Sequence, residues 1–267
     1  MRNKTGAILL SLVSLAAVSL PAHADEWSKT YNLTGRPDLR IETSDANIQV
    51  TTWDQNSIAA KVVSSHYKIG ENGLRVEEHQ DGNSVAIEVH YPHRNITIEW
   101  GDHHRVDIIV QMPREGRVNL RTGDGRIELT GLKGEMDLHS GDGSETLDAV
   151  DGSLRASAGD GHIQASGRFD ALDLKAGDGH LDVRAAAGSA ISSEWHLETG
   201  DGSISLELPG DLPADVDLHT GDGHIDLDLP ITTQGKLQSK SIRGKLNGGG
   251  NLLMIHTGDG SIHLRKA

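Results

Sequence analysis

The tripeptide Gly-Asp-Gly recurs seven times at a nearly constant spacing, and this repeat limits the possible folds more than any other feature of the chain. The first three intervals between its aspartates are eighteen residues each. A fixed period of this length is typical of a chain that stacks one small structural unit on the next. The repeated aspartates are Asp124, Asp142, Asp160, Asp178, Asp201, Asp222 and Asp259.

Apolar and polar residues alternate on both sides of each tripeptide. In the first unit, Val118, Leu120 and Thr122 share one face before the turn. Ile127 and Leu129 fall on the same face after it. Alternation with a period of two residues predicts strands with one buried face. The sequence therefore predicts an all-β fold, a single-stranded parallel β-solenoid of about eight coils of roughly 18 residues each.

The regular array covers only part of the chain, and three parts are distinguished. Residues 1–24 are predicted to be a signal peptide, residues 25–112 a β-rich N-terminal cap with the first irregular coils, and residues 113–267 the Gly-Asp-Gly solenoid. Inside the cap, residues 39–50 resemble a degraded repeat. Residues 237–246 fit the template as a degenerate coil, and we expect the coil that follows them to end the stack.

The first 24 residues have the three regions of a secretory signal peptide. Arg2 and Lys4 form the positive region, residues 7–20 the apolar region, and residues 22–24 the cleavage pattern. The apolar run is shorter than the roughly 20 residues that span a bilayer. We therefore expect export and cleavage before Asp25. The mature chain is then expected without a transmembrane segment, in the periplasm, at the cell surface or outside the cell.

Composition narrows the classes of partner. The formal net charge is −14, and the predicted signal peptide contains basic residues but no acidic ones, so the mature chain is more acidic still. Such a charge argues against nucleic acid and anionic lipid as partners, and leaves cations, basic proteins or neutral glycans. The chain has one Phe, four Trp and three Tyr, a scarcity that weakens the case for a carbohydrate enzyme. The absence of cysteine excludes disulfides and thiolate metal sites.

The Gly-Asp-Gly turn has two interpretations. In the structural one, the glycines provide positive φ or a close approach of backbones, and the aspartate caps the turn by accepting backbone N–H bonds. In the functional one, stacked coils place the aspartates about 5 Å apart, and a cation neutralises the column. Calcium is then the expected ion, since it prefers carboxylate and carbonyl oxygens, and all seven turn aspartates are its candidate ligands.

Two further columns accompany the turn. Small or hydroxyl residues precede it, and they are expected to bond the turn backbone: Thr122, Ser140, Thr199, Thr220, Ser239 and Thr257, with Ala158 and Ala176 between them. Histidines flank it on the outward face, where zinc or copper capture by pairs is the alternative to ordinary surface histidines. They are His162, His180, His224 and His263 after the turn, and His139, His196, His219 and His256 before it.

Glu145 breaks the apolar template, because Ile127 and Ile163 occupy the equivalent positions in the neighbouring units. A carboxylate in the core has a desolvation penalty and a raised pKa. We expect a bulge that rotates Glu145 outward, with a candidate functional site as the alternative.

The unit Leu-x-Thr-Gly-Asp-Gly-x-Ile-x-Leu, the segment 106–113 and the closing segment 246–250 resemble the bacterial putative-adhesin family, exported β-solenoids first described as a domain of unknown function. The resemblance covers most of the mature chain. It implies a right-handed coil and provides no catalytic residues to transfer.

The leading functional hypothesis is a non-enzymatic exported protein, adhesin-like or scaffolding, that presents an acidic repeat surface to a protein or glycan at the cell envelope. One alternative is a polysaccharide-active β-helix enzyme, a lyase or hydrolase that uses surface carboxylates. The other is an envelope-stress accessory protein that binds another protein.

Overall fold

The computed structural model describes residues 25–70, 73–92, 105–233 and 239–267. Within these ranges the protein consists of strands, turns and irregular segments, which confirms the all-β prediction. No helix in these ranges is long and apolar enough to cross a membrane. The predicted signal peptide, residues 1–24, lies outside the described residues.

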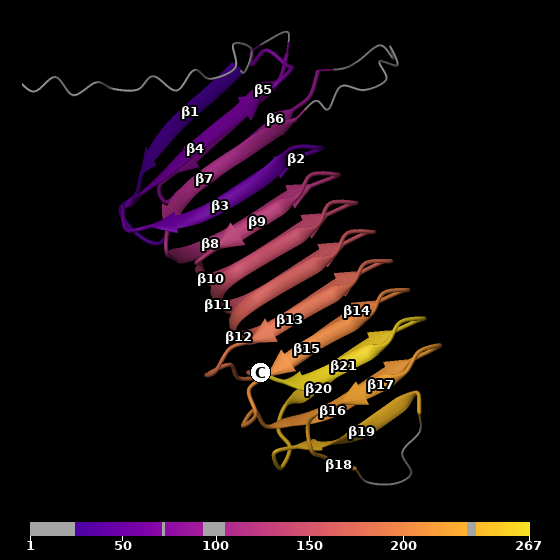
Figure 1. The fold of residues 1–267 in the computed structure, drawn as a ribbon. Coiled ribbons are helices and arrows are strands. Elements are labelled where there is room, and N and C mark those ends of the chain that lie inside the picture. The colour runs from indigo at the N-terminus through magenta and orange to yellow at the C-terminus, as the bar shows by residue number, and fades with distance from the viewer. Residues whose placement is uncertain (1–24, 71–72, 93–104, 234–238) are drawn as a thin grey trace, which may run out of the picture.

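The strands form one mixed sheet whose pairings follow two ladders (Figure 1). The first ladder contains, in spatial order, β5 (Arg75–Asp81), β6 (Ser84–His90), β2 (Asp38–Thr43), β8 (Glu115–Thr122), β10 (Lys133–Ser140), the second halves of β11 (Glu145–Ala158) and β12 (Ile163–Ala176), β14 (Glu194–Thr199), β20 (Leu252–Thr257), β16 (Ala214–Thr220), β19 (Ser241–Leu246) and β18 (Ile231–Thr233).

The second ladder runs beside the first and shares the long strands β11 and β12 with it. It contains, in spatial order, β1 (Asp25–Asn32), β4 (Ser57–Ser64), β7 (Val106–Pro113), β3 (Asn47–Trp53), β9 (Ile127–Thr130), the first halves of β11 and β12, β13 (Leu181–Ala185), β15 (Ile204–Leu208), β21 (Ile262–Lys266) and β17 (Ile225–Leu227).

In the repeat region, a strand of the first ladder leads through a Gly-Asp-Gly turn into a strand of the second, and we call such a pair a rung. Alternate side chains of both strands point to the same interior. Leu120 of β8 and Ile127 and Leu129 of β9 have no exposed surface, and they belong to one buried cluster that includes residues of both ladders. The hydrophobic core therefore lies between the ladders, as the alternating pattern predicts.

The spatial order of the rungs differs from their order in the chain. The rung of β20 and β21 lies between the rung of β14 and β15 and the rung of β16 and β17, with parallel pairings on both sides (Figure 1). At the other end, β2 and β3 lie between β6 and β7 on one side and β8 and β9 on the other. Residues 39–50 are thus a repeat, as predicted, but the last rung is internal and does not end the stack.

The structure does not confirm an uninterrupted parallel solenoid of eight consecutive coils. β16, β19 and β18 pair antiparallel, so the prediction of a degenerate parallel coil at residues 237–246 is wrong. Of that segment, Leu237 and Gln238 lie outside the described residues. β1, β4 and β7, and β5 with β6, also pair antiparallel at the opposite end. Period-two alternation is the same in both strand directions, so it does not distinguish them. The right-handed coil stays a prediction.

The glycines of the turns are required by close contact between neighbouring backbones. The amide of Gly141 donates to the carbonyl of Gly123 at 2.7 Å, and that of Gly159 donates to Gly141 at 2.6 Å. A Cβ on Gly161 would lie 2.0 Å from the carbonyl oxygen of Gly143. None of the turn tripeptides has a glycine with positive φ. The turn glycines are therefore needed for the close approach of neighbouring backbones, and not for positive φ.

The hydroxyl residues before the turns connect one rung to the next. The hydroxyl groups of Thr199, Thr220 and Thr257 donate to the second-glycine carbonyl of the adjacent turn at 2.6–2.7 Å. Ser140 instead donates to Gly143 of its own turn at 2.6 Å. Bonding of the turn backbone by this column is confirmed, except at Ser239, which is exposed in a different turn.

Replacement of Gly161 by alanine is expected to lower the free energy of unfolding by about 2 kcal/mol or more, because the backbone of the adjacent rung blocks the new methyl group. The matched control is Asp160→Ala in the same turn, since Asp160 is exposed and its carboxylate makes no hydrogen bond within the described residues. Thermal unfolding followed by circular dichroism measures both variants. A larger loss for the aspartate variant than for the glycine variant would contradict this assignment.

Candidate functional site

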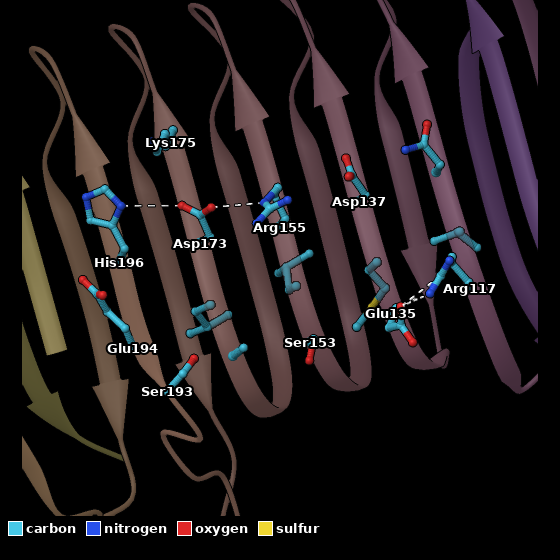
Figure 2. A pocket seen from close by; sticks show the side chains of 16 residues that line it. Arg117, Glu135, Asp137, Ser153, Arg155, Asp173, Lys175, Ser193, Glu194 and His196 are labelled. Atoms are coloured by element: carbon cyan, nitrogen blue, oxygen red, sulfur yellow. Dashed lines mark hydrogen bonds and ion pairs between the residues drawn. The ribbon is translucent and has the colours of Figure 1, made fainter. Parts of the chain in front are cut away.

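A groove of about 680 Å³ crosses the outward face of the first ladder, over β8, β10, β11, β12 and β14 (Figure 2). Its hollow follows from side-chain size. Ser153 of β11 is aligned with Ala171 of β12, and Ser193 lies just before β14, so the floor has small residues where its surroundings have long ones. Because every strand in this region points alternate residues outward, most of the side chains that line the groove are polar, with a few apolar ones between them.

Ion pairs link side chains of neighbouring strands across the groove. Arg117 donates to Glu135 through Nε at 2.9 Å. Asp173 lies between two partners, with Arg155 Nε at 3.1 Å and His196 Nδ1 at 3.5 Å (Figure 2). The Oδ1 atom of Asp173 is shielded from solvent and has no hydrogen-bond partner in the part of the chain that the structure describes. These pairs hold the side chains of neighbouring strands in fixed positions across the groove.

Three other charged groups of the groove make no ion pair or hydrogen bond with any described residue: Asp137, Lys175 and Glu194. Asp137 and Lys175 come from different strands, β10 and β12. The groove thus combines unpaired groups of both signs with the paired Arg117, Arg155 and their partners. The groove is therefore less acidic than the chain as a whole. Its lining suits a polar ligand of mixed or no charge better than a cation.

The seven turn aspartates lie in one column at the edge of the stack, and all are exposed. Asp222 pairs with Lys240 at 2.9 Å, which holds the pKa of Asp222 below its usual value. The other six side chains make no hydrogen bond with described residues, so the expected aspartate cap is wrong. In two of the turns a threonine hydroxyl accepts the backbone N–H instead, Thr122 Oγ1 from Gly125 and Thr257 Oγ1 from Gly260, each at 3.2 Å. No three of these aspartates bring their carboxylate oxygens within 4.8 Å of one another.

Histidines of neighbouring turns come together in pairs, as expected. The rings of His162 and His180 stack with centroids 4.9 Å apart. Both Nδ1 atoms accept backbone N–H bonds, from His180 at 3.0 Å and from Ser203 at 2.9 Å. His224 and His263 share Asp226, yet no histidine pair of the repeat belongs to a three-ligand group among the described residues. Zinc or copper capture by these pairs stays a prediction.

Glu145 points into the core, so the expected outward bulge is wrong. Its side chain has no exposed surface, and it lies in register between Ile127 and Ile163. Burial raises the pKa of Glu145 to about 8, against the lowering effect of hydrogen bonds to Ser140. Ser140 Oγ lies 3.1 Å from Glu145 Oε1, while Glu145 Oε2 has no hydrogen-bond partner within the described ranges. The strand pairings on both sides keep Glu145 in the core although burial of its carboxyl group is unfavourable. With a pKa of about 8, this group is neutral at pH 7.

We expect Glu145→Gln to raise the free energy of unfolding at neutral pH and to change it little in acid. Below pH 4.5, the ordinary pKa, the carboxyl group is protonated in the folded and unfolded chains alike. Between pH 4.5 and about 8 only the unfolded chain releases the proton, so wild-type stability falls as pH rises through this window. Glu145→Gln cannot ionise in the unfolded chain, so its free energy of unfolding at neutral pH is expected to exceed that of the wild type by on the order of 3 kcal/mol.

Urea unfolding of both proteins across this pH window measures the difference. Glu128→Gln, on the adjacent strand β9, is the matched control, because it removes a carboxylate that is partly exposed and lies outside the core. Equal stability of wild type and Glu145→Gln at all pH values would contradict the buried carboxyl group.

Sequence reasoning missed the groove. Its signal is present, since Ser153 and Ala171 are the small outward residues at equivalent positions of successive repeats. The alternation assigns them to the outward face, but only the alignment of neighbouring rungs shows that they adjoin and are surrounded by Arg155, Asp173 and His196.

A family model described as Toastrack DUF4097 matches residues 107–265, more than half of the chain. No curated protein matches the chain.

Among solved structures, the chain is similar to a putative cell adhesion protein from Clostridium sporogenes, with 12% identity, a TM-score of 0.46, and coverage of 91% of this chain and 100% of that one. A putative adhesin from Bacteroides fragilis has 9% identity, a TM-score of 0.40, and coverage of 91% and 97%. A putative lipid binding protein from Parabacteroides distasonis has 13% identity, a TM-score of 0.41, and the same coverage.

Proposed function

The chain belongs to the Toastrack DUF4097 family, and from this premise we propose that it is an exported, non-enzymatic binding protein of the cell envelope, adhesin-like in role. Its solenoid-like stack of rungs acts as a rigid support, and the groove on the first ladder engages an external partner. The observation that carries the proposal is a set of polar groups in the groove, Asp137, Lys175 and Glu194, whose side chains have no partner among the described residues and extend from strands that pair on both sides.

The ion pairs of the groove favour binding over catalysis. A catalytic carboxyl group must be free to contact the substrate. Glu135 already contacts Arg117, and Asp173 already contacts Arg155 and His196. The alternative of a polysaccharide lyase or hydrolase would require Asp137 or Glu194 to act without a positioned partner, so we place it second.

Export is part of the proposal and rests on the sequence. The predicted cleavage leaves Asp25 as the first residue, and β1 begins at Asp25. The carboxylate of Asp25 accepts the amide of Ile69 at 2.7 Å, so this residue takes part in the fold. Removal of residues 1–24 therefore preserves all the described strands. An envelope-stress accessory protein would use the same groove for a protein partner, and it remains within this proposal as one type of partner.

The double variant Arg155→Ala with Lys175→Ala is expected to weaken saturable binding of fluorescently labelled protein, residues 25–267, to intact bacterial cells by about tenfold or more. The reason is loss of two groove cations that are exposed to an incoming ligand. The matched control is Arg184→Ala with Arg265→Ala, an equal charge change on exposed residues of the second ladder. Equal loss in both double variants would reject the groove, and no saturable binding by the wild type would reject the function.

We further propose that the turn aspartates bind no resident cation. Millimolar calcium is expected to leave the melting temperature of residues 25–267 within about 1 °C of its value in EDTA, because no three of the carboxylates converge. A scanning calorimeter measures both conditions. A rise of several degrees that is lost in Asp142→Asn with Asp160→Asn would instead establish the column as a calcium site.

A further inference from the structure

Three potential metal ligands meet on the outward face of the β5–β6 hairpin, two strands away from β8 in the first ladder. They are Glu77 of β5 and Glu88 and His90 of β6, and one ligand atom from each lies within 4.8 Å of the other two. We propose that these three side chains bind a divalent transition metal ion of the zinc type.

The register of the hairpin brings these residues together. The turn at Gly82, whose φ is +57°, joins β5 and β6 so that Glu77 is directly opposite Glu88 and Arg75 is opposite His90. Glu88 and His90 are two residues apart, and so they share one face of β6. All three side chains therefore extend from paired backbone positions, and the arrangement requires no loop to close.

The distances between the three side chains are compatible with ligands of one metal ion. His90 Nε2 lies 3.5 Å from Glu88 Oε2 and 3.8 Å from Glu77 Oε2. Both separations exceed the N–H···O distances of about 2.7–3.2 Å that hydrogen bonds prefer. Ligand atoms at tetrahedral corners of a zinc ion, with bonds of about 2.0–2.1 Å, lie about 3.3 Å apart. Small side-chain rotations would thus place all three atoms on one ion.

The state of His90 also favours a bound ion. Its side chain is 43% exposed, but its Nε2 atom is shielded from solvent and has no hydrogen-bond partner among the described residues, although it faces two carboxylates. A polar atom in this state costs free energy unless something pairs with it. A metal ion between the imidazole and the two carboxylates would pair with all three groups at once.

The charges around the hairpin also favour a bound cation. Glu77 and Glu88 are like charges directly opposite each other, and Glu42 of β2 continues the row on the other side of Glu88. Such opposition destabilises a sheet. Glu42 is paired with Arg40 at 2.8 Å. Arg75 contacts Glu77 through Oε1 at 2.7 Å, which orients that carboxylate and leaves its Oε2 facing His90.

The donor set selects the class of ion. One imidazole nitrogen and two carboxylate oxygens suit zinc and its neighbours, whereas calcium and magnesium prefer oxygen ligands alone. Three protein ligands on an exposed strand face leave a fourth position open to water or to a group of a partner.

Isothermal titration of metal-free protein, residues 25–267, with zinc chloride tests the proposal, with magnesium and calcium chloride as comparison ions. We expect one tight zinc equivalent in the wild type that is lost in His90→Ala and in Glu77→Gln with Glu88→Gln, and no comparable binding of the other two ions. His79→Ala, on the same face of β5, and His162→Ala, in the stacked pair, are the controls and should retain it.

A melt in EDTA checks that each variant folds as the wild type does, and addition of zinc should raise the melting temperature only where the site is intact. Absence of zinc binding in the wild type would show a histidine–carboxylate ion pair only. Binding that survives His90→Ala, or that is lost in His162→Ala, would place the metal elsewhere. Either result overturns the proposal.

Discussion

The distance between neighbouring backbones at the Gly-Asp-Gly corner is the constraint on which the rest of the structure depends. Rungs hydrogen bond through this corner, and the second glycine of each turn faces a carbonyl oxygen that a Cβ would meet at about 2 Å. This contact holds the register of both ladders on either side of it. The outward columns, and with them the groove and the aspartate edge, are consequences of that register.

The sequence predicts which side chains of a rung are buried far better than it predicts which rungs are neighbours. Alternation correctly assigns Leu120, Ile127 and Leu129 to the interior, because burial acts on each strand separately. It does not determine that β20 lies between β14 and β16, since any rung with Leu or Ile at the same positions offers an equivalent neighbour. Strand direction is undetermined for the same reason, and β19 runs antiparallel.

The candidate sites depend on alignments between strands, and these are what a linear pattern lacks. The groove needs Ser153 beside Ala171, and the hairpin cluster needs Glu77 opposite Glu88. The hairpin alignment can be predicted from the sequence, because the turn residues 81–83 fix the register of the two strands once both are assigned. For Glu145, the template predicted an inward position, and the desolvation argument that moved it outward was wrong because the fixed register left it no other place.

The internal position of β20 and β21 has a consequence for how the molecule assembles. A stack built in chain order would add β16 and β17 directly onto β14 and β15, but in the folded protein that place belongs to strands made later. The rung of β16 and β17 therefore has its parallel neighbour only after the last strands arrive. The last strands to be made, β20 and β21, are therefore paired on both sides. Detaching this C-terminal segment would break strand pairings in the interior of both ladders, and not at their ends.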